Sequence, residues 1–358
     1  MQNADSELGL RVGEWVEVKS AEEILATLDG QQSVDQLPFM PEMLQYSGRK
    51  FQVRASAHKT ADTIELFSIR GMANTVHLEE LRCDGSAHGA CQASCLLYWK
   101  EAWLKRVPKE QSHFENLENG NKKGSEPLVR TPGCSALRDT LMRGTRFPEV
   151  PEQSERFRCQ ATEMLSATTE VRRRKRFDPR FYIKDLTSGN VNLFDFIRFG
   201  VLAMINSFFG RWFGRRIYPY IKGLAGEKTP SAELNLQPNE LVRVKPKEAI
   251  QRTLNQRLRN RGLNFDYEMV PYCNKGPFRV LCRVERLINE KTGELMKPKN
   301  PCIILDGVTC SGNYLHQRMF SRRGEYMFFR EIWLERFEET DSHNSQLVTG
   351  QNPRGKYP

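Results

Sequence analysis

Apolar and polar residues alternate near the start of the chain and predict a short β-strand at residues 15–18, which read Trp-Val-Glu-Val. A short amphipathic segment follows, and Ser20 and Glu23 have the spacing of a capping box at the start of a helix. Runs rich in β-branched and aromatic residues predict further strands at residues 50–54, 63–67 and 74–78. We therefore expect a small, mainly β module over residues 8–107.

The same pattern recurs further along the chain. Residues 13–28 and 239–254, at a constant offset of 226, share eight identical positions out of sixteen. The offset grows slowly, and later matches include Glu42/Glu268, Cys83/Cys310, Gly85/Gly312, Glu101/Glu331 and Trp103/Trp333. A repeat of this length indicates a tandem duplication, with a second module at residues 233–338.

The segment between the two copies has a different composition. Residues 108–127 are polar and predict a flexible linker, and residues 128–232 form a basic insert that we expect to be mainly helical. Helical patterns are predicted at residues 154–166 and after Asp178-Pro179. Residues 339–358 are polar and predict a disordered tail.

The strongest helical pattern of the insert lies at residues 194–213. Its apolar residues recur at helical spacing: Phe194, Ile197, Val201, Met204, Ile205, Phe208 and Trp212. Asp195, Arg198 and Arg211 interrupt the pattern, so the segment is not expected to be transmembrane. Two interpretations remain, a core helix and a helix that makes peripheral contact with a membrane surface.

The opening strand of each copy and the short strands after it resemble the SH3-like barrels of the KOW type. The two copies together also resemble an uncharacterised bacterial family, which implies no activity. The resemblance implies an α+β fold in which two SH3-like β-barrel modules are joined by the helical insert. KOW-type barrels occur in ribosomal and transcription-elongation proteins, so the resemblance also implies a nucleic-acid-binding or scaffold role.

Composition limits the class of protein. A chain of 358 residues with 39% hydrophobic residues and a mean hydropathy of −0.59 is typical of a globular protein of two or three domains. The N-terminal residues lack the pattern of a signal peptide, and nine cysteines without a regular framework favour a reducing compartment, so we expect a cytoplasmic protein. The net charge of +10 predicts an anionic partner, which could be a nucleic acid, an acidic protein or a lipid surface.

Three cysteines and a histidine fall within thirteen residues, as Cys83, His88, Cys91 and Cys95. Thiolate and imidazole are ligands of zinc and of iron–sulfur clusters, and four of them complete a tetrahedral shell. The alternative is that these are small buried cysteines beside a surface histidine. We predict one Cys3His centre in the first module, with zinc and an iron–sulfur cluster both open.

Residues 83–88, Cys-Asp-Gly-Ser-Ala-His, resemble the Cys-Asp-Gly-Ser-His motif of the small [2Fe–2S] proteins named after it, with one alanine inserted. That family also has an upstream Cys-x-Cys pair, and this chain has no cysteine before Cys83. The resemblance implies an iron–sulfur cluster.

The second copy keeps Cys310, with His316 nearby, but Ser321 and Glu325 stand about where Cys91 and Cys95 would be. A metal needed only for folding should be present in both copies, so the degenerate second site favours a functional role for the first. The counter-interpretation is that Arg318, Arg322 and Arg323 replace a structural metal in the second copy.

Other residues give weaker signals. His58 is a candidate general base and Asp84 a candidate partner of His88. The basic run Arg172, Arg173, Arg174, Lys175 and Arg176 is a candidate site for nucleic acid or another anion. Walker A, GxGxxG, GxSxG and HExxH motifs are absent from the sequence. We expect a metalloprotein that serves a redox or metal-assisted biosynthetic step; the alternative is a zinc-stabilised nucleic-acid-binding or scaffold protein.

Overall fold

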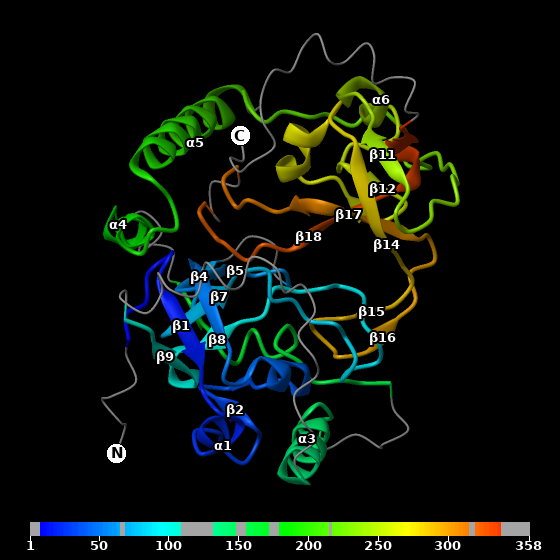
Figure 1. Ribbon diagram of the computed structural model, residues 1–358. Coiled ribbons are helices and arrows are strands. Elements are labelled where there is room, and N and C mark those ends of the chain that lie inside the picture. Colours follow the sequence, from blue (N-terminus) through cyan, green and yellow to red (C-terminus); the bar gives the residue numbers. More distant parts are fainter. Residues whose placement is uncertain are drawn as a thin grey trace. The chain divides into compact units, whose positions relative to one another are not determined.

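The computed structural model describes residues 8–64, 69–108, 132–147, 155–171, 179–214, 217–314 and 319–337 (Figure 1). The chain divides into two compact units, which are described separately. Unit 1 comprises Met1–Tyr220, Val284–Lys299 and Thr309–Tyr326, and unit 2 comprises the remaining segments. The predicted linker from residue 109, the basic run at residues 172–176 and the predicted tail lie outside the described residues.

An antiparallel sheet of five strands organises the first part of unit 1, in the order β8-β7-β4-β1-β9. The strands are β1 (Trp15–Val18), β4 (Lys50–Ser56), β7 (Thr75–Leu78), β8 (Trp99–Lys100) and β9 (Leu104–Arg106). The predicted strands at residues 15–18, 50–54 and 74–78 are thus confirmed. Of the predicted strand at residues 63–67, residues 63 and 64 form a bend, and the others lie outside the described residues.

Short elements connect and cover this sheet. They are α1 (Ala21–Leu25), β2 (Ser33–Val34), β3 (Leu37–Pro38), the 3₁₀ helices η1 (Pro41–Tyr46) and η2 (Glu101–Trp103), and a small sheet of β5 (Lys59–Ala61), β6 (Ile69–Gly71) and β10 (Thr169–Glu170). The capping box of Ser20 and Glu23 at the start of α1 is confirmed. The core centres on Trp99 and Trp103, which are fully buried, and Phe39 packs edge-to-face against Trp103.

The insert contributes α3 (Pro132–Gly144), α4 (Pro179–Thr187) and α5 (Leu193–Phe213) to unit 1. The predicted helices after Asp178-Pro179 and at residues 194–213 are confirmed. The predicted helix at residues 154–166 is wrong, since residues 155–166 form bridges and turns. Their backbone groups pair with distant residues instead: the Phe157 amide donates to Gly293 O and the Arg158 amide to Thr145 O. The hairpin of β15 (Leu287–Ile288) and β16 (Leu295–Met296) completes the unit.

Unit 2 contains a second sheet of five strands, in the order β18-β17-β14-β11-β19. Its elements are β11 (Leu241–Val244), α6 (Lys247–Gln251), β12 (Arg259–Asn260), β13 (Leu263–Asn264), η5 (Tyr267–Tyr272), β14 (Phe278–Val284), β17 (Cys302–Thr309), β18 (Tyr326–Phe329), η7 (Glu331–Trp333) and β19 (Leu334–Arg336). From β11 to η5, each element lies 226 residues after its counterpart between β1 and η1, the same offset that the sequence repeat has.

A buried carboxylate is used identically in both copies. Glu101 accepts hydrogen bonds from the amides of Leu8, Gly9 and Leu10. Glu331 accepts them from the amides of Leu234, Asn235 and Leu236. This correspondence supports the duplication. The mixed α+β class is confirmed, and neither five-stranded sheet is closed into a barrel by pairing of its end strands within the described ranges.

His77 on β7 gives unit 1 a predictable response to acid. Its side chain is buried and its Nδ1–H donates to Leu97 O at 2.9 Å. Burial lowers the pKa of His77 to about 4. In the unfolded chain His77 is protonated below pH 6.5, whereas in the folded chain it stays neutral down to about pH 4. The free energy of unfolding therefore decreases as the pH falls from 6.5 to about 4.

We expect the His77→Gln variant to lose this dependence. Between pH 7 and pH 4.5, the free energy of unfolding of the unsubstituted protein should fall by about 2 kcal/mol more than that of the variant. Urea unfolding at the two pH values measures the difference. Equal falls in both proteins would show that His77 is not responsible.

Candidate metal centre

The loop at residues 83–95 folds tightly because of Gly85. This residue has φ +72°, and a Cβ added to it would lie 2.1 Å from the carbonyl oxygen of Cys91. The amides of His88 and Ala90 both donate to Gly85 O, and the Cys83 amide donates to Cys95 O at 2.8 Å. The loop therefore folds back on itself and directs Cys83 and His88 to the same side. Residues 91–95 are not helical, so Cys91 and Cys95 do not share a helix face.

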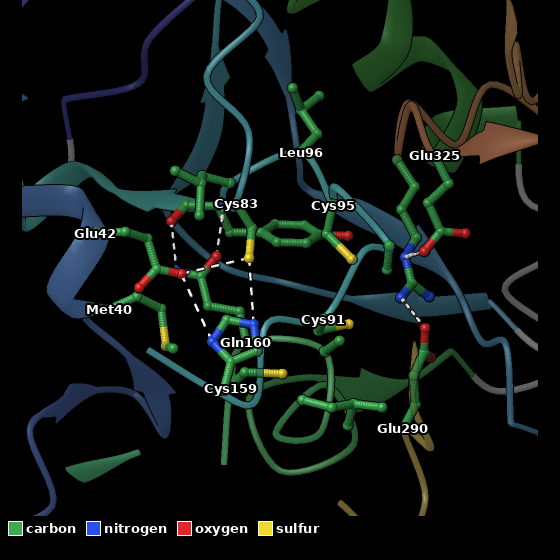
Figure 2. Close-up of a pocket in the computed structure, with 17 residues that line it drawn as sticks. Met40, Glu42, Cys83, Cys91, Cys95, Leu96, Cys159, Gln160, Glu290 and Glu325 are labelled. Atoms are coloured by element: carbon green, nitrogen blue, oxygen red, sulfur yellow. Dashed lines mark hydrogen bonds and ion pairs between the residues drawn. The ribbon is translucent and has the colours of Figure 1, made fainter. Parts of the chain in front are cut away.

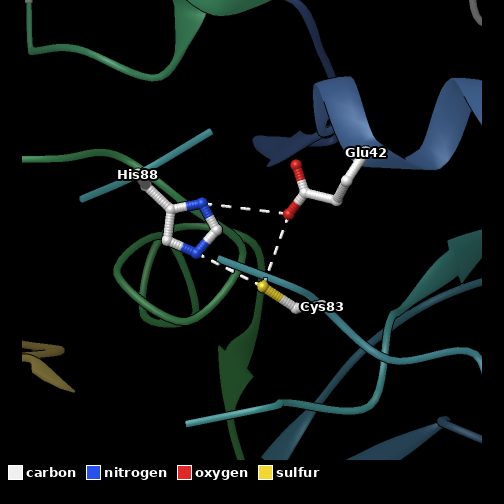
Figure 3. Close-up of side chains that lie close together, drawn as sticks. All are labelled: Glu42, Cys83 and His88. Atoms are coloured by element: carbon white, nitrogen blue, oxygen red, sulfur yellow. Dashed lines mark hydrogen bonds and ion pairs between the residues drawn. The ribbon is translucent and has the colours of Figure 1, made fainter. Parts of the chain in front are cut away.

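Three potential ligands meet beside this loop: Glu42 from η1, and Cys83 and His88 from the loop (Figure 3). The Cys83 thiol donates to Glu42 Oε1, with a sulfur-to-oxygen distance of 3.4 Å. His88 Nε2 lies 3.3 Å from Cys83 Sγ, and His88 Nδ1 lies 3.8 Å from Glu42 Oε1. One donor atom from each side chain lies within 4.8 Å of the other two, so the group could hold a metal ion.

Two of these contacts have the spacing of neighbouring ligands in a tetrahedral shell. Bonds of about 2.0–2.3 Å to a tetrahedral ion place neighbouring ligand atoms roughly 3.3–3.8 Å apart. The contacts of Cys83 Sγ with Glu42 Oε1 and with His88 Nε2 measure 3.4 and 3.3 Å and fall in this range. An imidazole binds an ion through one nitrogen, and with one nitrogen of His88 the three donor atoms lie within 4.8 Å of one another. The side chains must therefore move to bring all three onto one ion.

Two buried atoms of the group have no hydrogen-bond partner among the described residues, Glu42 Oε2 and His88 Nδ1. A buried polar atom without a partner costs free energy, and a bound ion would remove that cost for this group. Burial raises the pKa of Glu42 to about 7 and lowers that of His88 to about 4, so burial disfavours the charged form of both side chains.

A cavity of about 40 Å³ adjoins the group (Figure 2). Four thiols line it, those of Cys83, Cys91, Cys95 and Cys159. Burial raises the pKa of the Cys83 and Cys95 thiols well above the usual range and that of Cys159 to about 12. A cation would be needed to stabilise these sulfurs as thiolates.

The other side of the cavity carries an ion-pair network (Figure 2). The buried guanidinium of Arg323 donates to Glu290 at 3.1 Å and pairs with Glu325 at 2.6 Å. Together with Glu42, the lining contains three carboxylates and one guanidinium. This balance favours a cation over an anion as the occupant.

The corresponding loop of the second copy closes with two equivalent backbone contacts but carries different side chains. A Cβ added to Gly312, which has φ +69°, would lie 2.2 Å from Ser321 O, and the Cys310 amide donates to Glu325 O at 2.8 Å. Ser321 and Glu325 therefore stand where Cys91 and Cys95 stand in the first loop, as predicted.

Arginines hold this second loop. Arg322 donates to Asn190 O and Ser311 O, and Arg323 donates to Ala61 O. His316 and Arg318 lie outside the described residues.

The four residues of the predicted Cys3His set all line one cavity, but the three donor atoms that lie close together are not those of the predicted set. Cys83 and His88 lie together with Glu42, whereas Cys91 and Cys95 line the adjoining cavity. Sequence analysis missed Glu42 and Cys159. Glu42 could have been noticed in the sequence because it matches Glu268 in the second copy, and both side chains are buried. Asp84 accepts from the Ser86 amide and so stabilises the turn.

His58, the candidate general base, lies in a different polar group. Its Nδ1 is 3.1 Å from Ser56 Oγ and its Nε2 is 3.2 Å from Asp185 Oδ1. Asp185 also forms a fully buried ion pair with Lys59. Burial lowers the pKa of Lys59, and Asp185 opposes that effect. Ser56 and His58 border a separate cavity of about 220 Å³. A catalytic role for His58 stays a prediction.

No family model, curated protein or solved structure matches the chain. Function is therefore inferred from the geometry of the site and from the sequence.

Proposed function

We propose that this protein is a metalloprotein that binds one transition-metal ion through Glu42, Cys83 and His88 and uses it in a metal-assisted step. The observation that carries the proposal is the group of three donor atoms within 4.8 Å of one another, in which Cys83 Sγ lies 3.4 Å from Glu42 Oε1 and 3.3 Å from His88 Nε2. Two buried atoms of the group without a hydrogen-bond partner among the described residues, Glu42 Oε2 and His88 Nδ1, also support it, because a bound ion is one way to satisfy such an atom.

The donor set favours zinc. Carboxylate, thiolate and imidazole together suit a borderline ion, and zinc accepts all three. A structural zinc site has four protein ligands, whereas a catalytic site has three and an open position. Glu42, Cys83 and His88 supply three, and the adjoining cavity of about 40 Å³ leaves space for water or part of a substrate. An ion here would activate bound water or polarise a carbonyl group.

An iron–sulfur cluster is the second candidate, supported by the four thiols that line the cavity. A cluster is bound by cysteine thiolates and occupies more space than one ion. In this form Cys83, Cys91, Cys95 and Cys159 would be the ligands, and Glu42 would not. A redox role would follow.

We also propose that the two copies are SH3-like modules of the KOW type in a cytoplasmic protein. The equivalent strand orders of the two five-stranded sheets support the first part. The eight cysteines whose side chains the structure describes form no disulfide, which supports a reducing compartment. If the metal is structural, a nucleic-acid-binding or scaffold role becomes the preferred function, as the net charge of +10 allows.

Metal analysis of the protein purified without oxygen tests these proposals. We expect about one zinc per chain and no visible colour. The metal should be lost in Glu42→Ala and in Cys83→Ser but retained in Cys282→Ser, which replaces a free cysteine in unit 2. Iron with acid-labile sulfide, lost in Cys159→Ser but retained in Glu42→Ala, would establish the cluster instead. Absence of any bound metal, even after reconstitution, would refute both.

A further inference from the structure

Helix α5 has two apolar faces, and only one of them is covered. Phe199, Ala203 and Asn206 are buried on one face. Phe199 packs edge-to-face against Tyr314, and Phe196 stacks on Phe320 at a centroid distance of 5.5 Å. These contacts all lie within unit 1 and attach the helix firmly to it.

The opposite face carries what we call the exposed stripe. Its members are large apolar side chains that are 40–73% exposed: Leu193, Phe194, Ile197, Val201, Met204, Ile205, Phe208 and Trp212. At 3.6 residues per turn they occupy about 120° of the helix circumference, on the side away from the buried residues. Exposed apolar patches of this size mark interaction surfaces in soluble proteins.

The helix that carries the stripe is well defined at both ends. Asn192 caps the first turn by accepting a hydrogen bond from the Asp195 amide, and Gly214 ends the helix with φ +64°. Twenty-one residues give a length of about 31 Å. The stripe is therefore one continuous, straight ridge.

Arginines border the stripe near both ends. Arg198 and Arg211 are exposed and fall on its two edges by helical position, whereas Asp195 falls toward the covered face. If a second copy of this chain packed against the stripe, its own stripe would offer no acidic residue to pair with these arginines. Anionic lipid headgroups would instead meet both arginines with opposite charge.

By length and composition α5 could also cross a membrane, and among the described helices it is the one that passes this test. A spanning helix would have to give up the contacts of Phe199 and Phe196 and expose Asn206, which accepts from the Ile217 amide, to lipid. A helix that lies in the plane of the surface keeps them all.

We propose that α5 binds the surface of a bilayer that contains anionic lipid, with the exposed stripe at the boundary between headgroups and acyl chains. Arg198 and Arg211 then lie at the level of the lipid phosphates. The protein would be recruited to the membrane as a peripheral protein, through a surface that is independent of the metal centre.

Co-sedimentation of the full chain with phosphatidylcholine vesicles, with and without phosphatidylglycerol, tests the proposal. We expect binding that depends on the anionic lipid and a blue shift of the Trp212 emission, absent in Trp212→Phe. The affinity of the double variant Val201→Ser/Phe208→Ser for the vesicles should be lower by about tenfold or more. The matched control is Ile183→Ser, since Ile183 is an exposed apolar residue of α4 outside the stripe.

Four outcomes would overturn the proposal. They are no binding to either vesicle, equal loss of binding in Ile183→Ser, self-association that the double variant abolishes without any vesicle binding, and resistance of the bound protein to extraction by alkaline carbonate. The last would show a spanning helix. Reduced binding of Arg198→Gln/Arg211→Gln only to vesicles with phosphatidylglycerol would support the role given to the arginines.

Discussion

The Gly85→Ala variant is expected to lose the metal proposed for Glu42, Cys83 and His88, and about 3 kcal/mol or more of stability. The added Cβ would lie 2.1 Å from Cys91 O and 2.7 Å from Cys91 N, and both are backbone atoms that cannot rotate away. The loop must open to admit the methyl group, which separates Cys83 from His88. Metal content and urea unfolding measure the two effects.

Gly48 provides the matched control. Its φ of +71° is almost the same as the +72° of Gly85, but a Cβ added to Gly48 has no other atom within 4 Å. Gly48→Ala should therefore cost only about 1 kcal/mol, the cost of the left-handed backbone conformation, and should keep its metal. If both variants retained metal equally, the close approach at Gly85 could not be what forms the site.

Removal of the Asp185 carboxylate is expected to destabilise the protein by about 3–5 kcal/mol. Asp185 and Lys59 are paired with no exposure of either side chain, and His58 Nε2 faces the same carboxylate at 3.2 Å. In Asp185→Ala the Lys59 ammonium would be left buried without its counter-charge, beside the rings of Phe181 and Tyr182. Chemical unfolding at neutral pH measures the loss.

Two further variants separate this effect from a general cost of losing an ion pair. The double variant Asp185→Leu/Lys59→Met removes both charges and should recover most of the stability. Lys105→Ala removes one partner of an exposed pair with Glu23 and should cost less than about 1 kcal/mol. A double variant no more stable than Asp185→Ala would mean that packing at Asp185, and not the orphaned charge, explains the loss.

Elements that depend on neighbouring residues could be predicted from the sequence. The strand β1 follows from the alternation in Trp-Val-Glu-Val, and the start of α1 follows from Ser20 and Glu23, which contact each other. The internal repeat also predicted that Ser321 and Glu325 occupy the positions of Cys91 and Cys95, and the backbone contacts of the second loop agree with this.

Features that depend on distant contacts could not be predicted. Residues 154–166 have a helical pattern, yet the Gln160 side chain bonds both the amide and the carbonyl of Tyr98 and also Pro38 O. These bonds join segments more than sixty residues apart and hold the Cys159 backbone in a turn. The helix was predicted from local pattern, and for the same reason Cys159 was not recognised as part of the site.

The ligand group shows the same limit. Cys83 and His88 are five residues apart and could be paired by spacing, whereas Glu42 lies on a separate 3₁₀ helix. Spacing favoured Cys91 and Cys95 as the remaining ligands because it measures distance along the chain. The fold of η1 against the loop brings the Glu42 carboxylate within 3.4 Å of the Cys83 sulfur.

The residues that line the thiol cavity come from distant parts of the chain, from Met40 to Glu325, so the cavity is completed only late in synthesis. The proposed ligands Glu42, Cys83 and His88 are synthesised well before Arg323 and Glu325, which line the same cavity. A nascent chain, or one cut short before residue 323, would therefore present the thiols without the wall that covers them. The first copy cannot be expressed as a fragment with a complete cavity, and a chain that is not finished is the form most exposed to oxidation or to the wrong metal.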